Sequence, residues 1–493
     1  MTPENLKRTT FSGFIWMFME RIGAQVVTFV VSLVLARLLL PDDYGIVALA
    51  QIFINLANIF VMQGLNASLI QRDEAEDIEY STAFIANLTL ALGLYVFLFF
   101  ASPLLAQYYG KPILTPIFRV LSLRLPIGAL NAIQRAYVSR NMLFKKFFFS
   151  TLGGTIVSAF VGIGMALAGL GPWAIVGQYL TNSTIDTIVL WFTVNWHPKK
   201  MFSAAKLKEM IGFGWKILAA AFFNDLYLEL RSIVIGKGYS SEDLAYFNRG
   251  KQFPQLFYTN IASAITSVIF PVMSIKKDNN AGLKSNLSSS VKVSSYVLFP
   301  LLTGLAMVAS PLVKLILTDK WLPCVPFLQA YCISYAILPI QSIQEQLYKA
   351  KGRSDIVLKL FFIEKTVGII IIFVTMNISI WAIAVGMVVT SIFATVVHTI
   401  PMRNVINYSL INLVKDLLPD VVMSAGMAVV VYLLGMIPGK LIVTLLLQVI
   451  GGVLFYLIVS LMIRSKSLKM LLDLVNSKLN LSAIRKLESL FYR

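Results

Sequence analysis

The sequence predicts an all-α integral membrane protein with about 14 transmembrane helices, and three observations support this fold class. Of the 493 residues, 57% are hydrophobic and only 13% are charged, which is about half the charged fraction of an ordinary soluble protein. Apolar runs near bilayer length recur along the whole chain, and no polar gap is long enough for a soluble domain. The basic residues alternate between the two sides of these runs.

Hydropathy, interrupted at proline, glycine and charged residues, divides the chain into fourteen candidate spans. The spans fall near residues 11–37, 44–70, 80–106, 113–138, 147–169, 172–195, 210–236, 244–273, 293–317, 323–348, 358–377, 380–401, 416–436 and 441–463. The first span is too long for the core of a signal peptide and contains Glu20 and Arg21, so we expect it to be retained.

The distribution of basic residues predicts the orientation in the membrane. With the N-terminus in the cytoplasm, 27 basic residues fall in the inner loops and the C-terminal tail, and six at most fall outside. Because loops rich in lysine and arginine stay in the cytoplasm, we expect both termini there. This bias also explains the net charge of +18 without nucleic acid as a partner.

After Arg464 the chain becomes amphipathic. Its apolar residues at helical spacing are Leu468, Leu471, Leu472, Val475 and Leu479, and the lysines lie off this stripe. We expect this helix to lie on the anionic lipids of the inner leaflet. A tail that binds a partner protein is the alternative.

Short matches indicate an internal duplication. Gly13-Phe14-Ile15-Trp16 opens the first span, and Gly212-Phe213-Gly214-Trp215 opens the seventh. At the same shift of about 200 residues, Asp42-Asp43 falls on Glu242-Asp243 at the next outer turn. Further along, residues 131–135 match residues 341–345.

Six spans return the chain to its starting side, so the two halves would be parallel repeats about an axis along the membrane normal. Transporters with two rocking lobes have this arrangement. We therefore predict an N-lobe over residues 1–197 and a C-lobe over 198–403. Two further spans follow over 404–464, and an amphipathic cytoplasmic tail covers 465–493.

Corresponding spans of both halves carry polar, mostly cationic residues on one helical face. In the first half these residues are Arg21, Gln25, Gln51, Asn55, Arg124, Asn131 and Arg135. In the second half they are Lys216, Asn224, Arg231, Asn248, Lys251, Gln255, Gln341 and Glu345. A charge at bilayer depth costs at least about 2.5–3.5 kcal/mol, so it faces water or a partner. A shared central cavity that binds a ligand with phosphate charge and hydroxyl groups would satisfy these residues.

A structural alternative assigns the same residues to ion pairs and helix packing. Arg231 would then pair with Glu229, and Lys365 with Glu364. Adjacent residues point about 100° apart on a helix, so we expect no simple same-face bridge between Glu364 and Lys365, nor between Glu20 and Arg21. Asp225 and Glu229 share a face beside the cationic one and, with Glu20, are candidates for an ion-coupling site.

Motifs for catalysis are missing from the sequence. It contains two histidines, no nucleotide-binding or metalloprotease motif and no cysteine–histidine metal spacing. Cys324 and Cys332 lie in one apolar segment, where we expect them to pack as small hydrophobic residues. We therefore expect no enzyme, no metal site and no cofactor, with Na⁺ or H⁺ as the candidate coupling ion.

Two stretches carry a family resemblance. The first is the opening Gly13–Trp16 with Arg37-Leu38-Leu39-Leu40-Pro41-Asp42-Asp43-Tyr44-Gly45, and the second is Gly212–Trp215 with Glu242-Asp243-Leu244-Ala245-Tyr246-Phe247-Asn248-Arg249-Gly250. Both resemble the corresponding parts of polysaccharide flippases of the MOP (multidrug/oligosaccharidyl-lipid/polysaccharide) superfamily, of the Wzx and colanic-acid-exporter type. The resemblance covers about the first 400 residues.

The resemblance implies a V-shaped pair of six-helix lobes in a bacterial inner membrane. The cargo would be undecaprenyl-pyrophosphate-linked oligosaccharide repeat units, flipped from the cytoplasmic to the periplasmic leaflet for O-antigen, capsule or exopolysaccharide synthesis. A polysaccharide polymerase and assembly proteins would be partners. The family's cationic role falls on Arg21, although Glu20 beside it departs from the pattern.

Two other functions compete with this hypothesis. An ion-coupled small-molecule or multidrug exporter of the MATE type would favour acidic residues for cationic drugs, whereas the polar faces here are cationic. A membrane-embedded polymerase or ligase would need larger outer loops to hold acceptor sugars.

Overall fold

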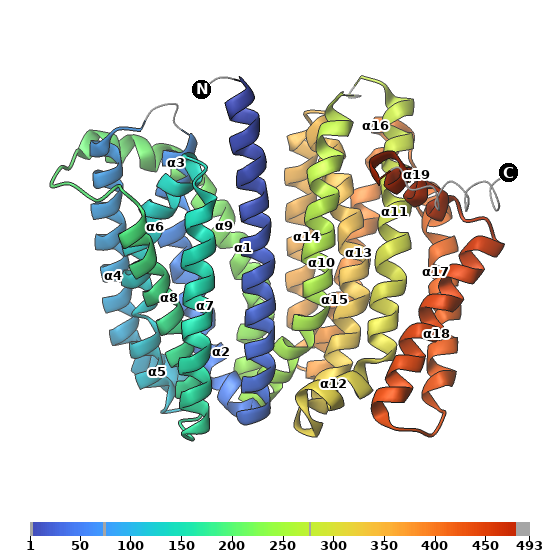
Figure 1. Cartoon of the computed structure of the whole chain (residues 1–493), viewed down its shortest axis with the longest axis horizontal. Coiled ribbons are helices and arrows are strands. Elements are labelled where there is room, and N and C mark those ends of the chain that lie inside the picture. Colours follow the sequence, from blue (N-terminus) through green and yellow to red (C-terminus); the bar gives the residue numbers. More distant parts are fainter. Residues whose placement is uncertain (1–2, 72–74, 276–277, 480–493) are drawn as a thin grey trace. The chain divides into compact units, whose positions relative to one another are not determined.

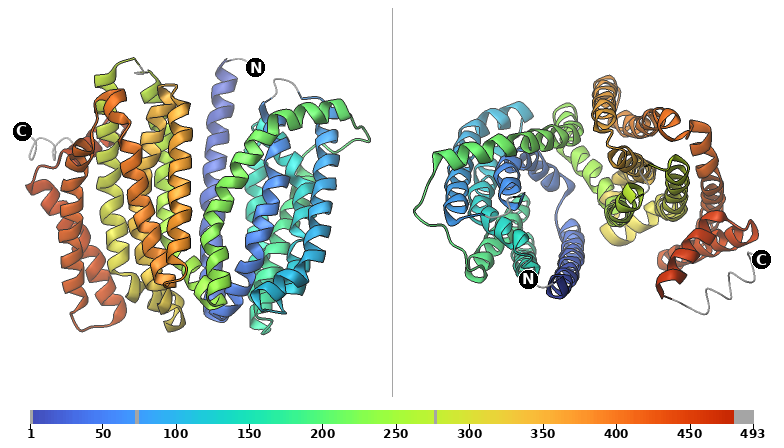
Figure 2. Two further views of the ribbon diagram at one scale, coloured as in Figure 1. Left: turned by 180° about the vertical axis from the view of Figure 1, so that it is seen from behind. Right: turned by 90° about the horizontal axis from the view of Figure 1, so that it is seen from above.

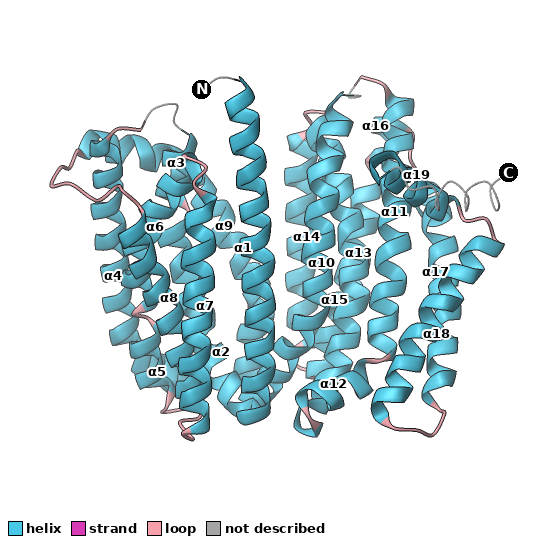
Figure 3. Ribbon diagram, in the orientation of Figure 1, coloured by secondary structure: helices cyan, strands magenta, loops and turns pink. Residues whose placement is uncertain are grey.

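The computed structural model describes residues 3–71, 75–275 and 278–479, and within helices it leaves undescribed the side chains of residues 3–15, 17, 18, 21, 264–268, 270–272 and 473–479. Throughout the described ranges the regular structure is helical, without strands (Figure 3). Contacts divide the chain into two compact units, Met1–Ala245 and Tyr246–Arg493.

Unit 1 is a bundle of long helices that run side by side (Figure 1). Its helices are α1 (Pro3–Leu38), α2 (Pro41–Met62), α3 (Gly64–Gln71), α4 (Asp77–Tyr109), α5 (Leu114–Leu121), α6 (Arg124–Arg140), α7 (Phe144–Leu167), α8 (Pro172–Thr193) and α9 (Ala204–Gly238). Helix α10 (Ser241–Ile275) begins in unit 1 and continues into unit 2. The contact-based division therefore places α9 in unit 1. The predicted lobe boundary at residues 197/198 rests on the repeat instead and stays a prediction.

The helices of unit 2 are also arranged side by side (Figure 2). They are α11 (Asn280–Met307), α12 (Ala309–Leu317), the 3₁₀ turn η1 (Asp319–Cys324), α13 (Val325–Ala350), α14 (Ser354–Thr375), α15 (Ile380–Thr399), α16 (Met402–Ile406), α17 (Leu410–Gly435), α18 (Leu441–Met462) and α19 (Lys466–Leu479). Cys324 and Cys332 are free and buried, as predicted.

The helices agree with the predicted spans. Among the described residues, nine helical segments are long and apolar enough to cross a bilayer, and each of the fourteen predicted spans coincides with one helix or one broken pair. The molecule is thus a multi-pass membrane protein. Chain reversals use expected signals: α4 ends at Gly110, whose φ of 66° is left-handed, and Pro41 occupies the first turn of α2.

The turns before α2 and α10, which the predicted repeat makes equivalent, have the same local geometry. The backbone N–H of Leu40 donates to the Asp43 carboxylate at 2.9 Å, and the N–H of Ser240 donates to Asp243 at 3.2 Å. In both turns an aspartate three residues into the first helical turn therefore satisfies a backbone donor that the helix leaves free. The shared cap supports the predicted duplication.

The tail helix α19 is docked on unit 2, at the end where α16 also lies (Figure 1). Leu468, the first residue of the predicted apolar stripe, is buried in a cluster with Tyr296, Met423 and Tyr456. The stripe therefore begins by covering protein rather than lipid, because α11, α17 and α18 leave an apolar surface there. The side chains of Val475 and Leu479 lie outside the described part.

Candidate functional site

The structure separates the predicted cavity residues by exposure. Asn55, Lys216 and Gln255 are exposed; Asn131, Arg231 and Gln341 are buried; and Gln25, Gln51, Arg124, Arg135, Asn224, Asn248, Lys251 and Glu345 are partly buried. The side chain of Arg21 lies outside the described residues. Glu20, Asp225 and Glu229 are all partly buried. Three polar side chains are thus exposed in the middle of long helices, where contact with lipid would be costly.

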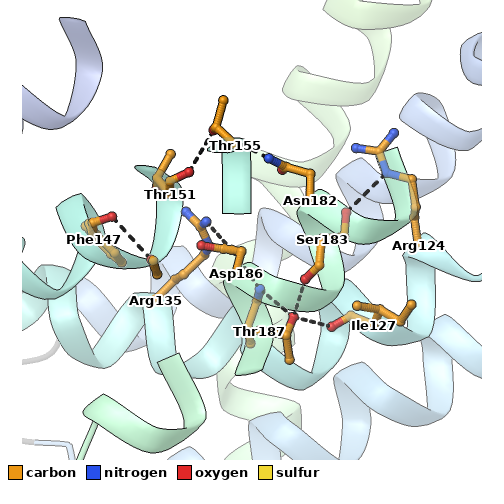
Figure 4. A network of polar contacts seen from close by, with 12 residues as sticks. Arg124, Ile127, Arg135, Phe147, Thr151, Thr155, Asn182, Ser183, Asp186 and Thr187 are labelled. Carbon is orange, nitrogen blue, oxygen red and sulfur yellow. Dashed lines mark hydrogen bonds and ion pairs between the residues drawn. The ribbon is translucent and has the colours of Figure 1, made fainter. Parts of the chain in front are cut away.

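Helices α6 and α8 are joined by a polar network (Figure 4). The amide of Asn131 donates to Asp186 Oδ2 at 3.0 Å and to Thr187 Oγ1 at 2.9 Å. Arg135, one turn further along α6, forms an ion pair with the same carboxylate oxygen of Asp186. Two of the three predicted residues of α6 are therefore bonded to Asp186 of α8 inside unit 1.

This network is incompletely satisfied. Within the described part of the chain, Asp186 Oδ1, Asn131 Oδ1, Thr151 Oγ1 and both amide atoms of Gln134 are buried without a hydrogen-bond partner. Each such atom forgoes a hydrogen bond that it would make in water. The region between α6, α7 and α8 therefore contains buried polar groups whose hydrogen-bonding capacity is only partly used.

Arg124, at the start of α6, has a different environment from Arg135. Its Nε donates to Ser183 Oγ at 3.3 Å, and its guanidinium group lies 5.0 Å from the centre of the Tyr179 ring. Its Nη1 is buried and has no hydrogen-bond partner among the described residues. Neither contact carries a negative charge, so this guanidinium group can still bind an anion such as phosphate.

Unit 2 repeats the amide–hydroxyl contact. Gln341 of α13 donates to Thr395 Oγ1 of α15 at 3.0 Å and to the Ser391 carbonyl at 2.8 Å. Trp173-Ala174-Ile175 near the start of α8 matches Trp381-Ala382-Ile383 of α15, and at this shift of 208 residues Thr187 falls on Thr395. Matching this Trp-Ala-Ile triplet in the two halves is the sequence signal that could have identified Thr187 and Thr395 as equivalent positions.

The charges of the two units are not repeated. At the shift of 208 residues, Asp186 falls on Ala394. At the shift of 210 residues that relates 131–135 to 341–345, Arg135 falls on Glu345. Glu345 pairs instead with Lys349 of its own helix at 2.8 Å. The buried ion pair between α6 and α8 is therefore a feature of unit 1 that α13 and α15 do not reproduce.

Other predicted residues have local partners. Arg231 donates to the Tyr227 hydroxyl at 3.5 Å, while its Nε is buried without a hydrogen-bond partner in the described structure. Asn224 donates to Asp225 at 3.2 Å. Lys365 Nζ lies 2.9 Å from Glu364 Oε1. The structural alternative that paired these two neighbours is confirmed for Glu364 and Lys365. Their Cβ atoms diverge on the helix, so the long side chains bend toward each other to form the pair.

An all-helical multi-pass membrane protein with polar residues on matched helices of a duplicated chain belongs to the transporter class. The family model described as "Polysaccharide biosynthesis protein" matches residues 34–326. This match covers more than half of the chain, and the chain belongs to that family. The predicted resemblance to a polysaccharide biosynthesis family is confirmed.

Curated relatives are similar over much of their length. The teichuronic acid biosynthesis protein TuaB of Bacillus subtilis (strain 168) is 28% identical over 307 residues, which cover 61% of this chain and 62% of TuaB. The alignment thus spans less than two thirds of that protein. The succinoglycan biosynthesis transport protein ExoT of Rhizobium meliloti (strain 1021) is 24% identical over 339 residues, which cover 69% of this chain and 68% of ExoT.

Solved structures share the fold. The lipid II flippase MurJ in an inward closed conformation has a TM-score of 0.72 at 18% identity and covers 92% of this chain and 99% of its own. An inward-facing MATE family multidrug resistance transporter of the MOP superfamily has a TM-score of 0.62 at 13% identity, with 78% of this chain and 94% of its own covered. The predicted fold class is confirmed.

Proposed function

We propose that this protein is a flippase that moves undecaprenyl-pyrophosphate-linked oligosaccharide repeat units from the cytoplasmic to the periplasmic leaflet of a bacterial inner membrane. It works by alternating access, with both termini in the cytoplasm, and supplies O-antigen, capsule or exopolysaccharide synthesis. Membership of the polysaccharide biosynthesis family carries this proposal. A polymerase and assembly proteins would receive the flipped unit.

The chemistry of the polar residues fits this cargo. Arg124 offers a guanidinium group whose Nη1 has no protein partner among the described residues, and a pyrophosphate group would supply the missing acceptors. Asn55, Lys216 and Gln255 are exposed in mid-helix, where amide and ammonium groups can bind sugar hydroxyl and phosphate oxygens. Each of these residues is therefore a candidate for binding the cargo.

The multidrug-exporter alternative shares the fold but fits the charges less well. A site for cationic drugs needs unpaired carboxylates, because opposite charges attract at short range. Asp186 is paired with Arg135, and Glu345 is paired with Lys349. We therefore propose a transporter of an anionic amphiphile that carries out no catalysis.

A triple variant tests this function. Arg21→Ala, Arg124→Ala and Lys251→Ala together remove three of the proposed phosphate-binding cations. In a strain that depends on this protein, we expect at least a tenfold loss of surface polysaccharide at normal protein levels. Lys314→Ala is the control, because Lys314 pairs with Asp319 at 3.1 Å and both side chains are exposed. Normal polysaccharide from the triple variant would overturn the proposed site, and drug sensitivity of the deletion strain would favour the exporter.

A further inference from the structure

Helices α14 and α15 of unit 2 bring three ionisable side chains together. Glu364 lies ten residues into α14, about 15 Å along the helix axis, and its side chain is 18% exposed. Its Oε1 lies 2.9 Å from Lys365 Nζ, and its Oε2 lies 3.6 Å from Nε2 of His398 on α15. Such residues at membrane depth mark ion or proton pathways by default.

His398 is the unusual member of this cluster. Its side chain is 9% exposed, and neither ring nitrogen has a hydrogen-bond partner within the described structure. A buried neutral imidazole normally donates from one nitrogen and accepts at the other. The gap of 3.6 Å to Glu364 exceeds hydrogen-bond distance by about half an ångström. A small movement of α14 or α15 would close it.

Helix α13 contacts α15 at His398. From α13, the Tyr348 hydroxyl donates to the backbone carbonyl of His398 at 2.6 Å. Glu345, also on α13, is paired with Lys349 at 2.8 Å. The charged partners of the Glu364 carboxylate are Lys365 and His398. A lysine within the cluster disfavours a hard cation such as Na⁺, which prefers oxygen ligands and is repelled by the ammonium group, whereas a proton can bind to imidazole or carboxylate.

We propose that Glu364, Lys365 and His398 form a proton-binding site, and that proton binding there drives the transport cycle; the second part rests on the proposed function. With Lys365 and Glu364 paired and His398 neutral, the cluster carries no net charge. A proton from water that forms an N–H bond on the free ring nitrogen makes an imidazolium, which then attracts Glu364. Release of the same proton restores the neutral ring.

The packing suggests what this proton controls. Gln341 bonds Thr395, Gln344 bonds Thr399 at 2.8 Å, and Tyr348 bonds the His398 carbonyl, so three contacts tie α13 to α15. The Glu364–His398 contact instead links α14 to this pair. Protonation of His398 therefore strengthens the contact between α14 and α15 and leaves the three contacts between α13 and α15 unchanged. A transporter can use such a switch to favour one conformation.

Histidine NMR tests the binding site directly, because the chain has two histidines. In the His197→Gln variant of the full chain, with ¹⁵N-labelled histidine in lipid nanodiscs, every imidazole signal belongs to His398. We expect these signals to show that the ring binds one proton reversibly. Glu364→Gln should weaken this proton binding, because it removes the carboxylate that attracts the imidazolium. An imidazole that does not titrate, or a midpoint unaffected by Glu364→Gln, would overturn the site.

Polysaccharide export tests the coupling separately. Glu364→Gln and His398→Gln should each reduce surface polysaccharide at least tenfold at normal protein levels, whereas Glu242→Gln, at an exposed outer turn, should not. Normal export by His398→Gln would overturn the coupling even if the imidazole titrates. If the unmodified protein restores no polysaccharide to a deletion strain, the proposed function fails, while the NMR titration still decides whether a proton binds.

Discussion

Gly45 of α2 lies against Ser241 at the start of α10 so closely that a Cβ on Gly45 would come within 1.8 Å of the Ser241 carbonyl oxygen. The hydroxyl of Ser241 also hydrogen-bonds Asp42, whose carboxylate pairs with Lys111 at 3.1 Å. The turns before α2 and α10 therefore touch within unit 1, and only glycine fits at the contact.

Gly45→Ala should destabilise the protein by more than the about 1–3 kcal/mol typical of an overpacked core, because the clash is with backbone that cannot change rotamer. Gly93→Ala is the matched control: it lies in α4 with nothing within 4 Å of its Cβ position, and alanine favours the helix. Apparent melting temperature by fluorescence-detected size exclusion is the measurement. Equal melting temperatures for the two variants would contradict the close approach.

The Arg135–Asp186 pair should respond asymmetrically to mutation. The Asp186 side chain is 8% exposed and that of Arg135 is 32% exposed. Arg135→Met therefore leaves a buried carboxylate without its cation and should cost about 3–5 kcal/mol. Asp186→Asn should cost less, because the freed guanidinium group can reach water.

The double variant provides the control for this pair. Arg135→Met with Asp186→Asn removes both charges, so its melting temperature should lie above that of Arg135→Met alone. If the two substitutions destabilise additively, the ion pair makes no contribution in the folded protein.

The repeated amide–hydroxyl contacts should contribute similar, small amounts to stability. Asn131→Leu and Gln341→Leu each remove bonds between helices, and such bonds in membrane proteins average about 0.6 kcal/mol with a maximum of about 1.7. Thr187→Val and Thr395→Val remove the acceptors of the same two bonds.

Double-mutant cycles across each pair measure the coupling energy, with melting temperature as the readout. We expect positive coupling in both units. Ser342→Ala, next to Gln341, is the control, because it removes a bond to the Leu338 carbonyl of its own helix at 3.4 Å. Coupling in one unit alone would argue that the two contacts are not equivalent.

The docking of α19 should depend on Leu468. Leu468→Asp places a carboxylate in the cluster with Tyr296 and Met423, where an unpaired charge is unfavourable. The helix should detach, and limited proteolysis should cleave after Arg464 at least several times faster. Lys466→Ala, at an exposed neighbouring position, should leave the cleavage rate unchanged. If lipid mainly holds the tail, Lys466→Ala should accelerate cleavage in nanodiscs more than Leu468→Asp does.

Hydropathy was sufficient to predict the fold class, and each predicted span coincides with described helix. A bilayer requires apolar segments of a minimum length with internally satisfied backbones, and both properties are local. The duplication was also visible in short motifs, and the shared caps of Asp43 and Asp243 support it. Orientation, cargo and the cationic cavity stay predictions.

Tertiary structure alone decided what each polar side chain contacts. Helical periodicity placed Asn55 and Asn131 on polar faces of their spans, yet Asn55 is exposed and Asn131 is bonded to Asp186. Sequence also gave no reason to connect Glu364 with His398, which are 34 residues apart and lie 3.6 Å from each other in space. The physical reason is that the local sequence determines on which side of its helix a residue lies. What that side contacts depends on which other helix packs against it.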